Sequence, residues 1–93
     1  MREYELILIV HPDLDETAFN EVVARVNGWI TDGGGQVTKT ELWGKRRLAY
    51  PIRKQKDGQY VFLHVTMAPQ KGADLERNLR FLEPIMRFSL VLK

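Results

Sequence analysis

The side chains of this 93-residue chain that could carry out chemistry are few, apart from one dense group of cations. No cysteine is present, which excludes thiolate nucleophiles, thiolate metal ligands and disulfides, and the only serine is Ser89. The two histidines, His11 and His64, lie far apart, and neither has a carboxylate at a spacing typical of a metal site or an acid–base pair. We therefore expect no catalytic residue, no bound metal and no cofactor, and we interpret both histidines as surface or turn residues.

The cations concentrate in one stretch. Seven of the fourteen Lys and Arg residues lie between Lys39 and Lys56, where Glu41 is the only acid, so this window has a formal charge of +6. The rest of the chain sums to −4, although the net charge of the whole chain is only +2. Cations interleaved with aromatic rings, here Trp43 and Tyr50, are typical of a surface that binds a polyanion. Lysines on an outer strand also protect a sheet edge from aggregation, and the charge pattern leaves both interpretations open.

Length and composition fit a single domain over residues 1–93, because 93 residues with 44% apolar content can build one hydrophobic core but not two. The apolar run Leu6–Val10 is too short for a signal peptide or a membrane span. The absence of cysteine gives no indication of an oxidising compartment. We expect a soluble, cytoplasmic protein with no membrane partner.

Apolar periodicity predicts the elements of the first third of the chain. Residues 2–10 alternate and become apolar on both faces before His11–Pro12, which predicts a central strand. A helix of about four turns follows, with Asp13 or Asp15 as its cap and Gly33–Gly35 as its end. Its apolar residues recur at spacings of three and four: Phe19, Val22, Val23, Val26 and Ile30.

The basic stretch belongs to a long second strand, which we predict over residues 36–53. Gly44 is expected to mark a bulge or bend, and Pro51 restricts the end of this strand to an edge position. We predict a hairpin turn at residues 56–59, because Asp57-Gly58 between two extended segments is a strong hairpin signal. The second and third strands should therefore be antiparallel neighbours.

The remaining pattern predicts a third strand over residues 60–67, a short helix over 74–82 and a last strand over 85–92. The order strand, helix, strand, strand, helix, strand is typical of the α+β class. It indicates a ferredoxin-like split βαβ sandwich, with a four-stranded antiparallel sheet and two helices on one face. Right-handed crossovers leave the other face of the sheet open.

The open face is expected to carry an apolar patch. Tyr60 and Phe62 share it with Ile7, Ile9 and Val91, and Arg87 and His64 lie among them. An uncovered patch of this kind usually binds a partner. RNA-recognition domains of the same architecture stack bases on aromatic residues of the third strand, and residues 58–63 partly match their signature, although such aromatics also occur for packing alone.

Two other function classes stay open from the residues alone. A general binder of single-stranded RNA would use Tyr60 and Phe62 as stacking platforms. A phosphatase-like or small-molecule-binding domain would use an arginine beside an asparagine, as in Arg25 with Asn27 or Arg77 with Asn78. Both of these pairs lie on predicted helices rather than on a loop that surrounds an anion with backbone N–H groups, so helix-surface polarity explains them better.

Several segments together resemble the bacterial small-subunit ribosomal protein S six (S6) family. They are Met1–Glu5 with His11–Pro12, the run Trp43–Ile52, and Arg80 with Arg87. The run Gly44–Ile52 is the most specific of them, and the likeness extends over essentially all of the chain. The resemblance implies a ferredoxin-like domain without catalytic activity. It also implies a structural role in translation, in which the protein binds the central domain of small-subunit ribosomal RNA together with ribosomal protein S eighteen (S18).

The resemblance also implies RNA-binding residues, which carry over onto Arg2, Lys45, Arg46, Arg47, Lys54 and Arg87. Because Arg46 and Arg47 are adjacent on a strand and point to opposite faces, at least one of them could serve packing instead. Many family members continue into a charged C-terminal tail, whereas Lys93 directly follows the last predicted strand here. We therefore expect the open face, through Tyr60, Phe62 and Val91, and the edge of the second strand to supply the surface for the partner protein.

Overall fold

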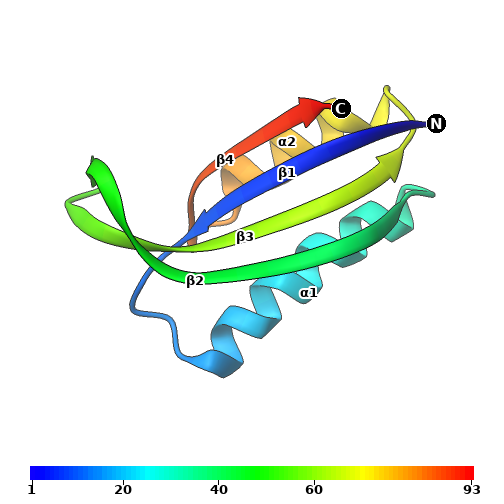
Figure 1. The fold of residues 1–93 in the computed structure, drawn as a ribbon. Coiled ribbons are helices and arrows are strands. Elements are labelled where there is room, and N and C mark those ends of the chain that lie inside the picture. The colour runs from blue at the N-terminus through cyan, green and yellow to red at the C-terminus, as the bar shows by residue number, and fades with distance from the viewer.

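The computed structural model describes residues 1–93 and contains four strands and two helices in the predicted order (Figure 1). No helix in the structure combines the length and the apolar character that crossing a membrane requires. The elements are β1 (Arg2–Val10), α1 (Glu16–Asp32), β2 (Gln36–Ile52), β3 (Gln55–Met67), α2 (Lys71–Phe81) and β4 (Ile85–Leu92).

The four strands form one antiparallel sheet in the order β2-β3-β1-β4. β1 pairs with β3 from Arg2↔Met67 to Val10↔Gln59, and it pairs with β4 on its other edge. The predicted central position of β1 is therefore confirmed. β2 pairs only with β3, so Pro51 lies in an edge strand, where its missing N–H costs no ladder hydrogen bond. The predicted ferredoxin-like class is confirmed.

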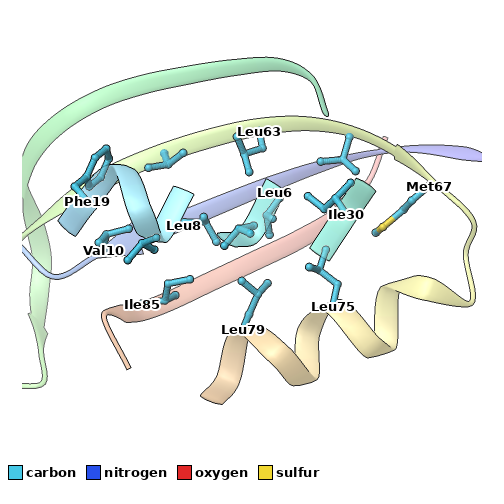
Figure 2. Close-up of a cluster of buried hydrophobic side chains, with 14 residues drawn as sticks. Leu6, Leu8, Val10, Phe19, Ile30, Leu63, Met67, Leu75, Leu79 and Ile85 are labelled. Atoms are coloured by element: carbon cyan, nitrogen blue, oxygen red, sulfur yellow. The ribbon is translucent and has the colours of Figure 1, made fainter. Parts of the chain in front are cut away.

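Both helices cover the same face of the sheet, and the core lies between them and the strands (Figures 1 and 2). Figure 2 shows Leu75 and Leu79 of α2 pointing towards Leu6 and Leu8 of β1. The core cluster contains 14 buried hydrophobic residues, and no polar or charged residue is buried anywhere in the chain. This face of the sheet is sealed, so binding chemistry has to lie elsewhere.

The ends of the helices follow from capping and turn chemistry. The Asp15 carboxylate accepts a hydrogen bond from the N–H of Ala18 at 2.8 Å, so Asp15 is the cap of α1. α2 begins at Lys71 instead of at the predicted residue 74. The reason is the turn at Pro69, in which the N–H of Gly72 bonds the Pro69 carbonyl, because this turn leads straight into the helix.

The turn of the β2–β3 hairpin differs from the prediction. Arg53 and Lys54 form it, with φ of 49° and 65°, and the predicted turn at residues 56–59 lies inside β3. Gly58 is paired with Arg46 and is buried there. A Cβ at Gly58 would lie 2.4 Å from Cγ2 of Ile9, so the glycine is needed for close packing and not for a turn.

Gly44 interrupts the ladder as predicted. The pairing of β2 with β3 shifts between Leu42 and Gly44, and Gly44 has a φ of 81°, which side chains with a Cβ rarely adopt. A bulge of this kind bends its strand and increases its twist. The basic half of β2 therefore leaves the plane of the sheet.

Candidate nucleic-acid interface

Four of the predicted RNA-binding residues lie together on a projecting part of the β2–β3 hairpin. We call residues 46–58 the hairpin arm, because they lie beyond Val10↔Gln59, the last pair that joins β3 to β1. Figure 1 shows the arm extending past the other strands, at the end of the sheet opposite to the two chain termini. Arg46, Arg47 and Lys54 belong to the arm and Lys45 lies at its base, and all four are exposed.

No cation of the arm is neutralised by an acid. The ion pairs of the structure are Lys39–Glu41, His64–Glu41 and Arg77–Asp74, and none of them involves the arm. Arg46 lies 5.9 Å from the centre of the Trp43 ring, and its Nε donates to the Trp43 carbonyl at 3.4 Å. A cation over an indole ring is held in place while it keeps its charge. Arg46 therefore packs on Trp43 while its charge stays free to bind an anion. The side chain of Arg47 makes no hydrogen bond and no ion pair.

The remaining two predicted RNA contacts occupy different places. Arg2 begins β1 at the end of the sheet that holds the termini, so the structure does not bring it together with the arm (Figure 1). Arg87 of β4 donates a hydrogen bond to the Tyr50 hydroxyl and lies 5.8 Å from the centre of that ring. Arg87 is thus in contact with the arm, although it belongs to the opposite edge strand.

The aromatic residues of the open face form a stack that the sequence did not reveal completely. The Trp43 ring lies nearly parallel to Tyr60 and Phe62, with centroid distances of 6.3 Å and 5.6 Å. Trp43 itself remains 43% exposed. The stack was not predicted because a hairpin turn at residues 56–59 pairs β2 and β3 in a different register from the turn at Arg53 and Lys54.

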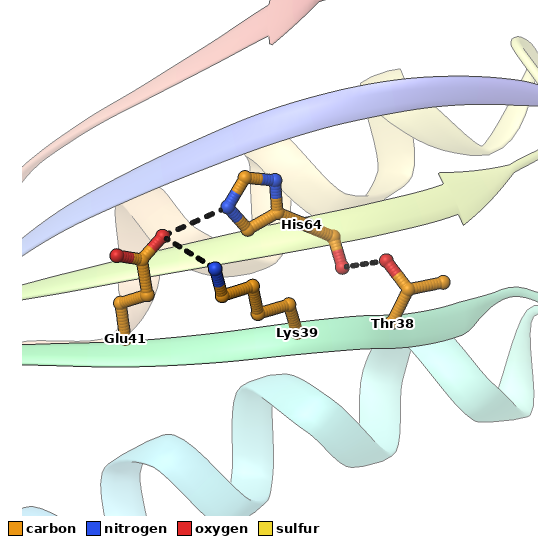
Figure 3. Close-up of polar contacts among 4 residues, drawn as sticks. All are labelled: Thr38, Lys39, Glu41 and His64. Carbon is orange, nitrogen blue, oxygen red and sulfur yellow. Dashed lines mark hydrogen bonds and ion pairs between the residues drawn. The ribbon is translucent and has the colours of Figure 1, made fainter.

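The stack continues into a polar cluster around His64. His64 Nε2 lies 2.9 Å from Glu41 Oε2, and Lys39 Nζ lies 4.0 Å from the same oxygen (Figure 3). His64 is a half-buried residue of the open face beside Phe62, and it has a carboxylate partner that the sequence did not indicate. The two partners lie on neighbouring strands and far apart in sequence, so no linear spacing could reveal them.

This cluster also perturbs Glu41. The hydrogen bond from His64 is the largest influence that lowers the pKa of the Glu41 carboxyl below its ordinary value of 4.5. The charge of Lys39 lowers this pKa further, against partial desolvation, which raises it. The result is a carboxylate that is held ionised at the edge of the aromatic stack. This arrangement stabilises a surface and offers no free acid or base.

The rest of the open face is apolar and partly accessible. Ile7 and Ile9 are half-buried between the strands, and Val91 is 49% exposed on β4. Ile7, Ile9 and Arg87 line a small hollow of about 100 Å³, which is too small for most ligands. No group of three or more His, Asp or Glu side chains is arranged to hold a metal ion. The surface is therefore suited to contact with another macromolecule.

Comparison with known proteins also points to contact with other macromolecules. The sequence model of the family described as "Ribosomal protein S6" matches residues 3–92. The chain belongs to the ribosomal protein S6 family. The small ribosomal subunit protein bS6 of Fusobacterium nucleatum is 41% identical over 91 residues, which cover 98% of this chain and 97% of that protein. The bS6 protein of Moorella thermoacetica is 40% identical over 88 residues, covering 95% and 90% respectively.

A solved structure extends the match to three dimensions. The crystal structure of 30S ribosomal protein S6 from Thermotoga maritima superposes with a TM-score of 0.94, at 29% identity, over 99% of this chain and 87% of that chain. As a member of the S6 family, the chain is a structural component of the small ribosomal subunit and not an enzyme.

Proposed function

We propose that this protein binds the central domain of small-subunit ribosomal RNA together with S18, and that the hairpin arm supplies its main RNA contacts. Membership of the S6 family implies binding to ribosomal RNA within the small subunit, and the proposal adds the region, the partner and the residues. The observation that carries it is the arm itself, where Lys45, Arg46, Arg47 and Lys54 are exposed and unpaired.

The chemistry of the arm suits phosphate recognition. Each cation that meets a phosphate releases condensed counterions, so affinity should fall steeply as salt rises. Folded RNA is recognised largely through its shape and its backbone, and a ribbon of cations that bends out of the sheet suits contacts of this kind. Specificity then comes from the fold of the RNA junction and from the partner protein.

Arg87 and Arg2 extend this surface in two ways. Arg87 keeps its charge while it bonds the Tyr50 hydroxyl, so it adds to the positive field beside the arm. Arg2 lies at the far end of the sheet and would contact a separate segment of the RNA. Two separated contact regions on one rigid domain would fix the orientation of the domain on the RNA.

The open face is the proposed surface for S18. Tyr60 and Phe62 lie on β3, and the half-exposed Val91 lies on β4, with β1 between the two strands. No element of the chain covers this face. These rings stack on Trp43, so the face favours a packed protein partner over unpaired bases that need free ring faces. Two modest surfaces joined rigidly would then act as one larger RNA-binding site.

The test is equilibrium binding to a central-domain fragment of the RNA across a salt series, with and without S18. Arg46→Ala with Arg47→Ala should weaken binding about tenfold or more and lower the salt slope by about two, because two phosphate contacts are lost. The matched control is Arg25→Ala with Arg77→Ala, which removes the same charge from exposed positions on the helices. Equal losses in the two double variants would contradict a specific role of the arm.

The partner surface needs a separate measurement. Phe62→Glu should abolish binding of S18 in the absence of RNA, because it places a charge in the middle of the apolar patch. Phe62→Leu keeps that position apolar and serves as the control. Unchanged binding of S18 to the Phe62→Glu variant would remove the open face from the proposal while leaving the arm intact.

A further inference from the structure

The hairpin arm should not hold its shape unaided. A two-stranded ribbon is at best marginally stable in water, and the pairing of this one is interrupted between Arg47 and Ile52. The arm also carries several like charges that repel one another. Something outside the ribbon must therefore hold it against the body of the domain.

One anchor is apolar and lies at the base of the arm. Leu48 is only 8% exposed although its neighbours on β2 are exposed. Leu48 and Met86 come together over Gly58, next to Ile9, where a Cβ at Gly58 would meet all three side chains. This small cluster is separate from the main core. It fixes the base of the arm but does not reach the turn.

The second anchor is at the turn and is made by Arg53. Its Nη1 donates to the Glu83 carbonyl at 2.8 Å, and its Nη2 donates to the Ile85 carbonyl at 3.4 Å. These carbonyls lie on either side of Pro84, whose own carbonyl accepts from the N–H of His11 at 2.8 Å. The segment that receives Arg53 is thus itself tied to the end of β1. A planar guanidinium with several fixed donors suits two carbonyls at once.

We propose that Arg53 is a positioning residue, whose guanidinium ties the turn of the hairpin arm to the segment before β4 and so holds Lys45, Arg46, Arg47 and Lys54 as one RNA-binding surface. This inference rests on the proposed function of the arm. It goes beyond that function because the guanidinium of Arg53 donates to carbonyls of its own chain and affects RNA binding only by positioning the other cations. The hydrogen bond from Arg87 to the Tyr50 hydroxyl is a further contact between β4 and the arm.

A direct phosphate contact is the competing role for Arg53. Arg53, Arg80 and Arg87 line one surface hollow of about 240 Å³ with no carboxylate among its lining residues, so a phosphate could also reach the guanidinium there. The two roles predict different salt behaviour. Loss of a phosphate contact lowers the salt slope by about 0.7 to 0.9, the values per phosphate for single strands and for B-DNA, whereas loosening of the arm lowers affinity at a nearly constant slope.

The experiment compares Arg53→Ala with Lys56→Ala, which removes the same charge from another exposed position of the arm. Hydrogen exchange is first measured on the free protein. Arg53→Ala should raise the exchange rates of backbone amides in residues 46–58 about tenfold, through loss of hydrogen bonds made by a charged group, while Lys56→Ala leaves them unchanged. Arg53→Lys, which keeps the charge but donates from a single nitrogen, should fall between them. Equal exchange in the alanine variants would overturn the proposal.

RNA binding is then measured across the salt series with S18 present. Arg53→Ala should lose about tenfold in affinity with a slope close to that of the unchanged protein, in line with a looser arm. A slope lowered by about one, with unchanged exchange, would make Arg53 a direct phosphate contact instead. If the unchanged protein fails to bind the RNA, the proposed function is wrong, and the exchange data alone still decide whether Arg53 fixes the arm.

Discussion

The two faces of the sheet are built from the same strands yet have opposite properties. The face under α1 and α2 buries 14 hydrophobic residues and no polar or charged residue. The open face holds aromatic rings and Glu41, which is hydrogen-bonded to His64, and the hairpin arm holds cations without acidic partners. The first face contributes to the protein through hydrophobic packing, and the second presents charged and aromatic groups to solvent. Substitutions should therefore change stability on one face and binding on the other.

The largest effect is expected on the sealed face. Leu8 is fully buried on β1, so Leu8→Ala should lower the free energy of unfolding by about 3 kcal/mol, from lost transfer energy and a residual cavity. Urea denaturation followed by circular dichroism measures it. The control is Phe81→Ala, since Phe81 is 84% exposed and its removal should change stability by less than about 0.5 kcal/mol. Similar costs at the two positions would break the contrast between a packed core and a solvated surface.

The second largest effect is expected at Gly58, where part of the open face is tightly packed. Gly58→Ala should cost about 2 kcal/mol, because the new Cβ would fall 2.4 Å from Cγ2 of Ile9, a branched side chain that cannot swing away. The double variant with Ile9→Ala removes the clashing methyl and should recover part of this loss. Additive costs in the double-mutant cycle would show that the two positions do not meet.

A smaller effect is expected at the aromatic stack. Trp43→Ala removes the ring that lies on both Tyr60 and Phe62 and should cost about 1 kcal/mol, less than a core residue because Trp43 is 43% exposed. Trp43→Phe keeps an aromatic ring and should keep most of the stability. A cost equal to that of Leu8→Ala would mean that the open face contributes to stability as strongly as the core does.

The smallest effect is a pH dependence from Glu41. Its pKa is lowered in the folded state, so its contribution to stability is present above the ordinary value of 4.5 and is lost as the pH falls through the lower folded-state pKa. Glu41→Gln should therefore lower the Tm by a few degrees at most at neutral pH. Plots of Tm against pH for the variant and the unchanged protein should converge in acid. Curves that stay parallel in acid would show that charge is not the source of the difference.

The sequence predicted those parts of the fold that depend on periodicity. Alternation in β1 and in residues 60–67 identified the buried face, and the three glycines identified the end of α1. The sequence left Asp13 and Asp15 as possible caps, of which the structure shows Asp15. The hairpin turn was predicted wrongly because Asp57-Gly58 carries the stronger local signal. Two residues with positive φ, Arg53 and Lys54, make the turn instead, and the close approach of Ile9 to Gly58 overrides the local preference.

The candidate site was predictable only where its residues are neighbours in sequence. The cations of the arm form one run, so their charge was visible at once, although their binding role stays a prediction. The stacking of Trp43 on Tyr60 and Phe62 was missed because the wrongly placed turn gives a different register of β2 on β3. The partner of His64 was missed because Glu41 lies on another strand. Arg53 was hidden for the same reason, since the carbonyls that it bonds are about thirty residues further on.

The position of β1 also has a consequence in time. β1 is made early in synthesis, yet its two neighbours are β3 and β4, and Tyr4 pairs with Leu92 at nearly the opposite end of the sequence. A nascent chain would therefore carry β1 with one open edge until β4 has left the exit tunnel. Unpaired edges invite wrong partners, and distant pairings form late. A protein of the small ribosomal subunit thus completes its own sheet only after the last of its four strands has left the ribosome that makes it.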